Sequence, residues 1–174
     1  MRTLGKRVTN YLRSIQQTST HELISKGESD RVEFKSTLRW NLRTQKKDKA
    51  MTHAILKTIA AFLNTEGGIL FVGVADDGTI LGLKNDNFEN EDKLLLFLTN
   101  TLKSQLGALQ LSNIHFHTEK INNQDMLRID VHPSEQPCYL SYENEERFYI
   151  RTGPSTNALE LSKVYNYIKK RFST

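Results

Sequence analysis

The sequence predicts an α+β fold, in which a mixed, mainly antiparallel β-sheet is flanked by helices. Apolar residues recur at helical spacing over residues 50–63 and 90–106, which predicts two long helices. Shorter segments with alternating or continuous apolar residues predict strands before, between and after them. Because helices and strands follow one another without a regular strand–helix–strand order, the class is α+β.

The first 20 residues are predicted to form an N-terminal basic amphipathic helix, since Leu4, Val8, Leu12 and Ile15 recur at helical spacing. The rest of the chain, residues 21–174, has a length that suits one domain. No internal repeat and no long linker divides it. A basic arm over residues 36–49 lacks a clear period and is predicted to be a loop inserted in this domain.

The domain is predicted to begin with a short helix that ends at Gly27. Residues 31–35 alternate in period two, which predicts a strand with one face exposed to water. The helix over residues 50–63 ends near Gly67 and Gly68. The strand that follows is apolar on both faces, so both of its faces should be covered.

Residues 75–78, Ala-Asp-Asp-Gly, predict a tight turn, after which residues 79–83 return as the next strand. In the second half, Asn122 and Asn123 are predicted to turn one strand into the next. The remaining predicted elements are strands over 113–121, 125–131, 137–141 and 147–151, a loop over 151–156, and a final helix.

Composition bears on compartment and partners. The single cysteine, Cys138, excludes an intramolecular disulfide framework and a Cys-X-X-Cys zinc site, and it favours a cytoplasmic location. No apolar run approaches the roughly 18 residues of a membrane span, so no membrane partner is expected. The net charge is +4, with +7 in residues 1–49 and −3 in the remainder. Clustered positive charge favours a polyanionic partner, and a solvated surface is the alternative.

Four acidic residues are candidates for a metal site. Glu28 precedes the strand over residues 31–35, Glu33 lies within it, and Asp76 and Asp77 follow the buried strand. If the two strands are neighbours, three of these carboxylates could hold Mg²⁺ or Mn²⁺ for phosphodiester chemistry. In the alternative interpretation Glu33 is solvated and the two aspartates only serve a turn.

Other cofactor sites are not expected. The glycines Gly67 and Gly68 close a helix and open a strand, the reverse of a phosphate-binding loop, so no ATP is expected. The histidines lack the spacing of a zinc site. No Gly-X-Ser-X-Gly segment supports a serine nucleophile.

The basic arm is a candidate nucleic-acid contact, because an aromatic residue lies among its cations. The cations would contact phosphates and Trp40 would stack on a base. The alternative is a mobile basic loop with Trp40 packed inward. The candidate residues are Arg39, Trp40, Arg43, Lys46, Lys47 and Lys49.

Three segments of the sequence stand out together. They are GESDRVEFK over residues 27–35, AAFLNTEGGILFVGVADDGTILGL over 60–83 and FYIRTGPST over 148–156. In combination they resemble the Schlafen family, in its single-lobe prokaryotic type with an AlbA-like domain. Their order matches the family, and the similarity spans roughly residues 20–172.

The resemblance implies a mixed sheet with helices, nucleic-acid binding and, in some members, metal-dependent endoribonuclease activity on tRNA and rRNA. The family's two glutamates map to Glu28 and Glu33. Its aspartate maps to Asp76, with Asp77 in reserve, because Ala75 stands where relatives often carry an acid. The nuclease cores with two lobes are longer, so a homodimer is expected to supply the second half of the groove.

These observations lead to two hypotheses. In the first, the chain is a divalent-metal-dependent endoribonuclease acting on structured RNA such as tRNA. Glu28, Glu33 and Asp76 hold the metal, and Lys35 stabilises the added negative charge. In the second, it is a DNA- or RNA-binding module or regulator without catalysis.

Overall fold

A four-stranded sheet forms the centre of the computed structural model, which describes residue 14 and residues 17–172. The edge strand β1 (Val32–Lys35) runs parallel to its neighbour β4 (Gly68–Val72), and the other two pairs of neighbours are antiparallel. The predicted α+β class and the mixed, mainly antiparallel sheet are therefore confirmed. The strand order is β1 (Val32–Lys35), β4 (Gly68–Val72), β6 (Gln124–Val131) and β5 (Ile114–Ile121).

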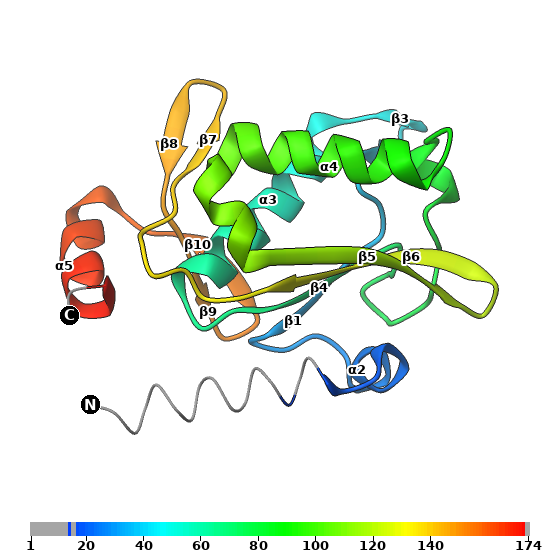
Figure 1. Ribbon diagram of the computed structural model, residues 1–174, viewed down its shortest axis with the longest axis horizontal. Helices are drawn as coiled ribbons and strands as arrows, with labels where there is room; N and C mark the ends of the chain where they lie inside the picture. Colours follow the sequence, from blue (N-terminus) through cyan, green and yellow to red (C-terminus); the bar gives the residue numbers. More distant parts are fainter. Residues whose placement is uncertain (1–13, 15–16, 173–174) are drawn as a thin grey trace.

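Helices cover both faces of this sheet (Figure 1). The long helices α3 (Lys49–Asn64) and α4 (Glu91–Leu106) lie on one face, and the short α2 (Thr20–Lys26) lies on the other. The helix α5 (Leu161–Phe172) packs at the end of α3, where the Tyr167 hydroxyl donates to the Asn64 carbonyl at 2.9 Å. Two 3₁₀ helices, η1 (Lys84–Asp86) and η2 (Ala108–Asn113), connect these elements.

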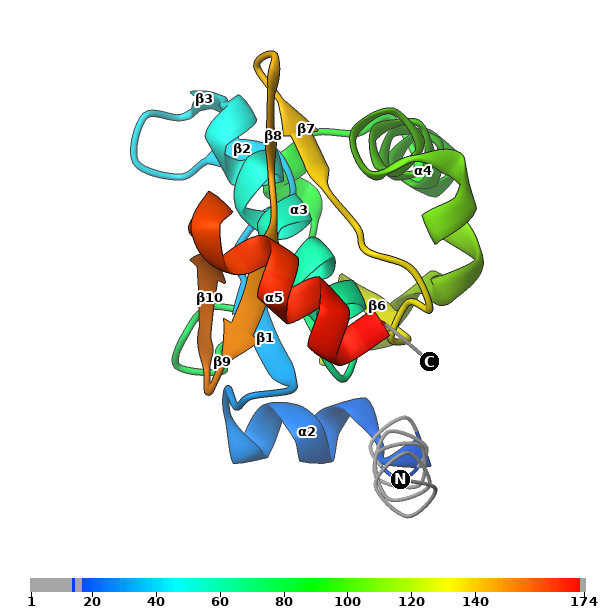
Figure 2. The ribbon, with the colours of Figure 1, turned by 90° about the vertical axis from the view of Figure 1, so that its left-hand side faces the viewer.

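Three short hairpins surround the central sheet (Figure 2). They are β2 (Trp40–Asn41) with β3 (Lys46–Lys47), β7 (Leu140–Tyr142) with β8 (Glu145–Arg147), and β9 (Tyr149–Thr152) with β10 (Ser155–Ala158). The predicted strand over residues 137–141 is shifted into β7, and the one over 147–151 is divided between β8 and β9.

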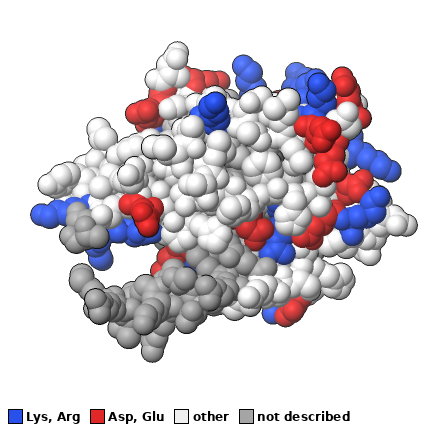
Figure 3. Space-filling model, viewed as in Figure 1, with Lys and Arg blue, Asp and Glu red and all other residues white. Residues whose placement is uncertain are grey.

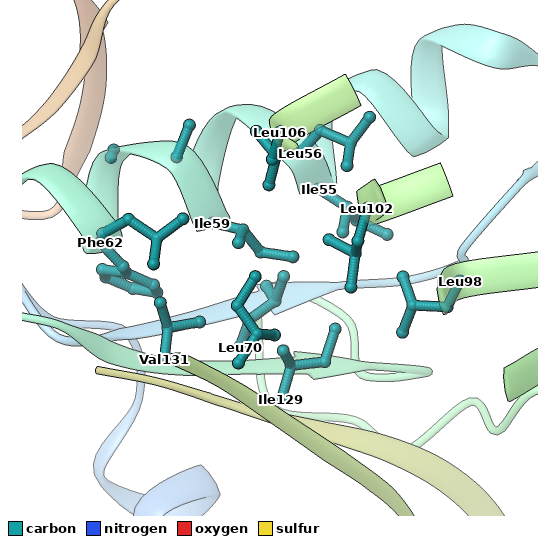
Figure 4. Packing of buried hydrophobic residues seen from close by; sticks show 14 of the residues in the cluster. Ile55, Leu56, Ile59, Phe62, Leu70, Leu98, Leu102, Leu106, Ile129 and Val131 are labelled. Atoms are coloured by element: carbon teal, nitrogen blue, oxygen red, sulfur yellow. The ribbon is translucent and has the colours of Figure 1, made fainter. Parts of the chain in front are cut away.

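The main core fills the space between the sheet and the two long helices (Figure 4). The apolar residues of α3 point toward the core. The buried residues of α4 are leucines at every fourth position, so one leucine in each turn meets the apolar face of α3. The fully buried β4 lies beneath them, as its continuous apolar sequence predicts. The residues labelled in Figure 4 are Ile55, Leu56, Ile59, Phe62, Leu70, Leu98, Leu102, Leu106, Ile129 and Val131.

A smaller core lies on the other face, between α2 and the sheet. Val32 and Phe34 of β1 point into it with Leu23 of α2. Glu33 and Lys35 alternate with them and point to the opposite face, where their side chains are only 12% and 25% exposed. The predicted alternation of β1 is therefore confirmed, but its polar face is only partly exposed, because residues far away in the sequence pack against it.

The glycines after α3 allow two backbones to approach closely. Gly67 has φ +77°, and its amide donates to the Phe62 carbonyl at 3.0 Å, which ends the helix. A Cβ on Gly68 would lie 2.5 Å from the Phe62 ring and 2.7 Å from the Arg31 carbonyl oxygen. These two glycines end the helix and bring the next strand against β1, as the sequence indicates.

The turn predictions are confirmed in part. Asn122 and Asn123 have φ of +50° and +60°, as a tight turn between β5 and β6 requires. The predicted strand over residues 79–83 is absent from the described residues. Only the bridge between Val74 and Ile80 forms there, because the next two amides both donate to the single carbonyl of Gly73.

The predicted N-terminal helix lies almost wholly outside the described residues. Within the described residues, no helix is both long enough and apolar enough to cross a membrane.

Cys138 is expected to be inert toward thiol reagents while the domain is folded. Its side chain is 1% exposed, and burial raises the pKa of the thiol to about 12. At pH 8 a disulfide reagent that releases a chromophore should therefore react only as fast as the protein unfolds. Reaction at the rate of a free thiol without denaturant would contradict this assignment.

Candidate nucleic-acid interface

Glu28 lies beside the outer edge of β1. Its Oε1 accepts a hydrogen bond from the Phe34 amide at 2.9 Å. This amide points away from the sheet and has no strand partner among the described residues, so the carboxylate supplies its acceptor. The Ser29 hydroxyl, next in the chain, accepts from the amides of Arg31 and Val32 at 3.2 and 3.1 Å. The segment before β1 is thus folded back onto the strand by its own polar side chains.

Glu33 is neutralised by two cations. Its Oε2 pairs with Arg151 Nη2 at 2.7 Å, and its Oε1 accepts from Lys35 Nζ. The Glu33 side chain is 12% exposed and the Arg151 side chain is 4% exposed, so water screens this contact poorly. Glu33 therefore connects the central sheet to the β9–β10 hairpin.

Arg151 is a site residue to which sequence reasoning assigned no role. It lies in the segment over residues 148–156, but nothing in the local sequence shows what its side chain reaches. Its guanidinium donates to the Ser29 carbonyl at 2.8 Å and to the Thr156 hydroxyl at 3.0 Å, and it lies 5.1 Å from the centroid of the Phe62 ring. The guanidinium of Arg151 thus contacts the segment before β1, the end of α3 and the β9–β10 hairpin.

Asp76 and Asp77 occupy the exposed turn after β4. Asp77 Oδ1 accepts from the Thr79 amide at 2.9 Å, and the bonds to Thr79 lower the pKa of the carboxyl. The turn is closed by the Gly78 amide, which donates to the Ala75 carbonyl at 2.9 Å. Asp77 therefore stabilises the turn, which is the alternative to metal binding that the sequence left open.

The proposed metal ligands do not gather into one group. Among residue 14 and residues 17–172, no three His, Cys, Asp or Glu side chains are placed to hold a metal ion together. Glu28 and Glu33 have the amide and cation partners described above. This arrangement does not fit a three-carboxylate cation site, and metal binding stays a prediction.

The basic arm is an ordered hairpin whose base is held by a buried acid, Asp86. The Asp86 carboxylate is fully buried and accepts from three consecutive amides, those of Leu38 at 2.8 Å, Arg39 at 2.7 Å and Trp40 at 3.1 Å. Burial raises the pKa of Asp86, and these amide bonds oppose that shift. Sequence reasoning missed Asp86, because its partners lie more than 40 residues away.

Arg39 is also part of this anchor. Its guanidinium donates to the carbonyls of Asp86 and Asn87 at 2.9 and 2.8 Å, and it lies 3.5 Å from the centroid of the Phe88 ring. Burial lowers the pKa of Arg39. The structure therefore separates Arg39 from the exposed cations with which the sequence grouped it.

The rest of the arm folds back toward α3. The Asp48 amide donates to the Arg39 carbonyl at 2.8 Å, and the Asp48 carboxylate caps α3 by accepting from the Ala50 amide at 2.9 Å. At the tip, the Asn41 side chain accepts from the amides of Arg43 and Thr44 at 3.0 and 3.1 Å. The arm is thus not the loose loop that its sequence suggested.

The exposed cations of this hairpin and of the adjoining first residue of α3 form a local positive surface, which we call the basic hairpin. It consists of Arg43, Lys46, Lys47 and Lys49, all exposed, with Trp40 half-buried in the adjoining strand. Figure 3 shows Lys and Arg side chains at the upper right, where β3 lies in Figure 1, with Asp and Glu side chains nearby. Figure 3 also shows Lys and Arg side chains at the left and right edges, so the basic hairpin is one of several positive areas on this face.

The fold and this surface define a small α+β domain that carries an anchored basic hairpin at one end of α3. Residues 28–160 match the family model described as Schlafen, AlbA_2, and the chain belongs to this family.

Two solved structures share the fold. The DIP2311 protein from Corynebacterium diphtheriae matches with a TM-score of 0.60 and 18% identity over 83% of this chain. This chain covers only 28% of that protein. The N-terminal domain of a protein related to the ATP-dependent DNA helicase RecG, from Nitrosomonas europaea, matches with a TM-score of 0.53 and 20% identity. That match covers 83% of this chain and 97% of the other.

Proposed function

We propose that this chain is a nucleic-acid-binding domain and that the basic hairpin is its main contact with phosphates. The observation that carries the proposal is the combination of exposure and anchoring. All four cations of the basic hairpin are exposed, and none of them takes part in the ion pairs of the described residues. Exposed cations that form no ion pair and are held on an ordered hairpin can replace the counterions of a nucleic-acid backbone with little loss of conformational entropy.

The family supports this proposal, since nucleic-acid binding is what the Schlafen resemblance implies. The relation of the Nitrosomonas protein to a DNA helicase agrees with it. Structured RNA such as tRNA is the more specific substrate expected, and DNA is the alternative.

Metal-dependent RNA cleavage is the second and more specific form of the proposal. The placement of Glu28 and Glu33 at the edge strand β1 favours it, because Glu33 lies in this strand and Glu28 is hydrogen-bonded to it. The ion pairs of Glu33 with Arg151 and Lys35 argue against it, because the ligand charge that would attract a cation is already balanced. We therefore place binding without cleavage first.

Reversing two charges of the basic hairpin should weaken binding. For the variant Lys46→Glu/Lys47→Glu we expect at least a tenfold loss of affinity for a tRNA or a DNA duplex at 100 mM salt, measured by fluorescence anisotropy. The slope of log affinity against log salt should fall by about 2, since each phosphate contact contributes about 1.

The matched control is Lys26→Glu/Lys120→Glu, which changes the net charge equally on α2 and β5, away from the basic hairpin. Equal losses for the two variants would mean that binding follows net charge alone, which contradicts the proposed interface. If the wild-type chain binds neither nucleic acid near physiological salt, nucleic-acid binding itself is wrong.

Incubation of a tRNA mixture with Mn²⁺ or with EDTA separates binding from cleavage. We expect intact RNA in both conditions. Metal-dependent cutting that Glu33→Gln abolishes, in a variant that still melts cooperatively, would establish the nuclease form and reverse our ranking.

A further inference from the structure

A cleft of about 390 Å³ opens beside the basic hairpin, between α3, α4 and the β7–β8 hairpin. Figure 2 shows β7 running between the two helices, and Figure 1 places β3 near the start of α3. Lys49 lines the cleft and belongs to the basic hairpin, so a chain bound along the hairpin would pass its mouth. The volume lies in the range of small-ligand pockets.

Aromatic rings form part of the wall. The rings of His53 and Tyr142 stack with centroids 3.8 Å apart and an angle of 26° between their planes. Phe97 of α4 also lines the cleft. Flat rings of this kind are the surfaces on which nucleobases stack.

Two residues that line this cleft each have a buried side-chain atom without a hydrogen-bond partner among the described residues. The atoms are Nδ1 of His53 and Oε1 of Gln105. A buried polar atom without a partner is unfavourable, so two such atoms in residues that line one cleft point to a ligand. The hydroxyls of Thr52 and Thr101, by contrast, donate to the carbonyls of Leu38 and Phe97 at 2.9 and 2.7 Å.

We propose that this cleft binds one unstacked base of a single-stranded nucleic acid whose phosphates lie on the basic hairpin. The inference rests on the proposed function and deepens it, since it names the strand state that the domain prefers. The carbonyl oxygen of Gln105 accepts from an amino or imino group of the base, His53 Nδ1 binds the neighbouring atom of the same edge, and Lys49 meets the adjacent phosphate. Only a base outside a duplex exposes that edge.

The test compares a fluorescein-labelled single strand of 12 nucleotides with the same strand carrying abasic sites. The variant His53→Phe/Gln105→Met keeps the ring and the side-chain length but removes both polar atoms. We expect wild type to prefer the intact strand by at least tenfold, and the variant to lose most of that preference. The control is Gln110→Met, which removes a similarly buried and unpartnered amide oxygen in η2, outside the cleft.

Three outcomes would overturn the inference. Wild type could bind the intact and the abasic strands with equal affinity, or the double variant could keep the wild-type preference for the intact strand. In the third outcome, Gln110→Met would lose as much of that preference as the double variant does. A free nucleoside monophosphate that binds wild type but not the variant, while strand binding is equal, would assign the cleft to small nucleotides instead. Failure of the proposed function is distinguishable, because Lys46→Glu/Lys47→Glu would then leave strand binding unchanged.

Discussion

The variant Arg151→Met is expected to lower the free energy of unfolding by about 3 kcal/mol. The substitution leaves Glu33 with Lys35 alone and removes the donors to the Ser29 carbonyl and the Thr156 hydroxyl. Breaking a buried ion pair on one side leaves the other charge in a poorly solvated place, and this cost exceeds the loss of attraction itself. Urea unfolding followed by circular dichroism measures the change.

The matched control is Arg147→Met. Arg147 also pairs with a glutamate in a neighbouring position, Glu145 at 2.6 Å, but the two side chains are 58% and 63% exposed. Exposed ion pairs contribute little to stability because water screens them, so this variant should unfold almost as wild type does. Equal destabilisation of the two variants would show that Arg151 is not the buried anchor described here.

The variant Asp86→Ala is expected to cost at least as much, about 3–5 kcal/mol, because it leaves three amides without their acceptor. The loss should also be local. Amide hydrogen exchange at Leu38, Arg39 and Trp40 should accelerate more than at the centre of α3, since the carboxylate holds the base of the hairpin. Affinity for nucleic acid should fall as well, because the cations lose their fixed positions.

Asp77→Ala serves as the comparison for Asp86→Ala. It removes an exposed carboxylate that accepts from one amide in a turn, so a much smaller change than for Asp86→Ala is expected. If Asp86→Ala unfolds like Asp77→Ala, or if exchange at residues 38–40 is unchanged, Asp86 does not hold the hairpin.

The sequence predicts the regular elements of this fold well, because their information is local. The helix over residues 50–63 and the strand pair around Asn122 and Asn123 follow from periodicity and turn chemistry alone. The strand predicted over residues 79–83 is not formed, for a reason that the hydrophobic pattern could not show. Two amides there converge on the Gly73 carbonyl, and the positive φ of Gly73 and Gly82 allows that geometry.

The candidate site is predicted less completely, because its decisive contacts join residues far apart in the chain. Glu33 looks like a free carboxylate until Arg151, more than 100 residues later, is placed beside it. Arg39 looks like a phosphate-binding cation until the loop around Asp86 is packed against it. A sequence shows which residues carry charge, whereas the fold decides which of those charges remain available.

The carboxylate of Glu28 has one more consequence, for assembly. A strand at the edge of a sheet normally offers its amides to any other extended chain, which is a route to aggregation and to dimers joined by a continuous sheet. Here the outward amide of Phe34 is already bonded to Glu28 at 2.9 Å. A second copy that paired along β1 would first have to displace that carboxylate, so a homodimer of this domain should form through another surface.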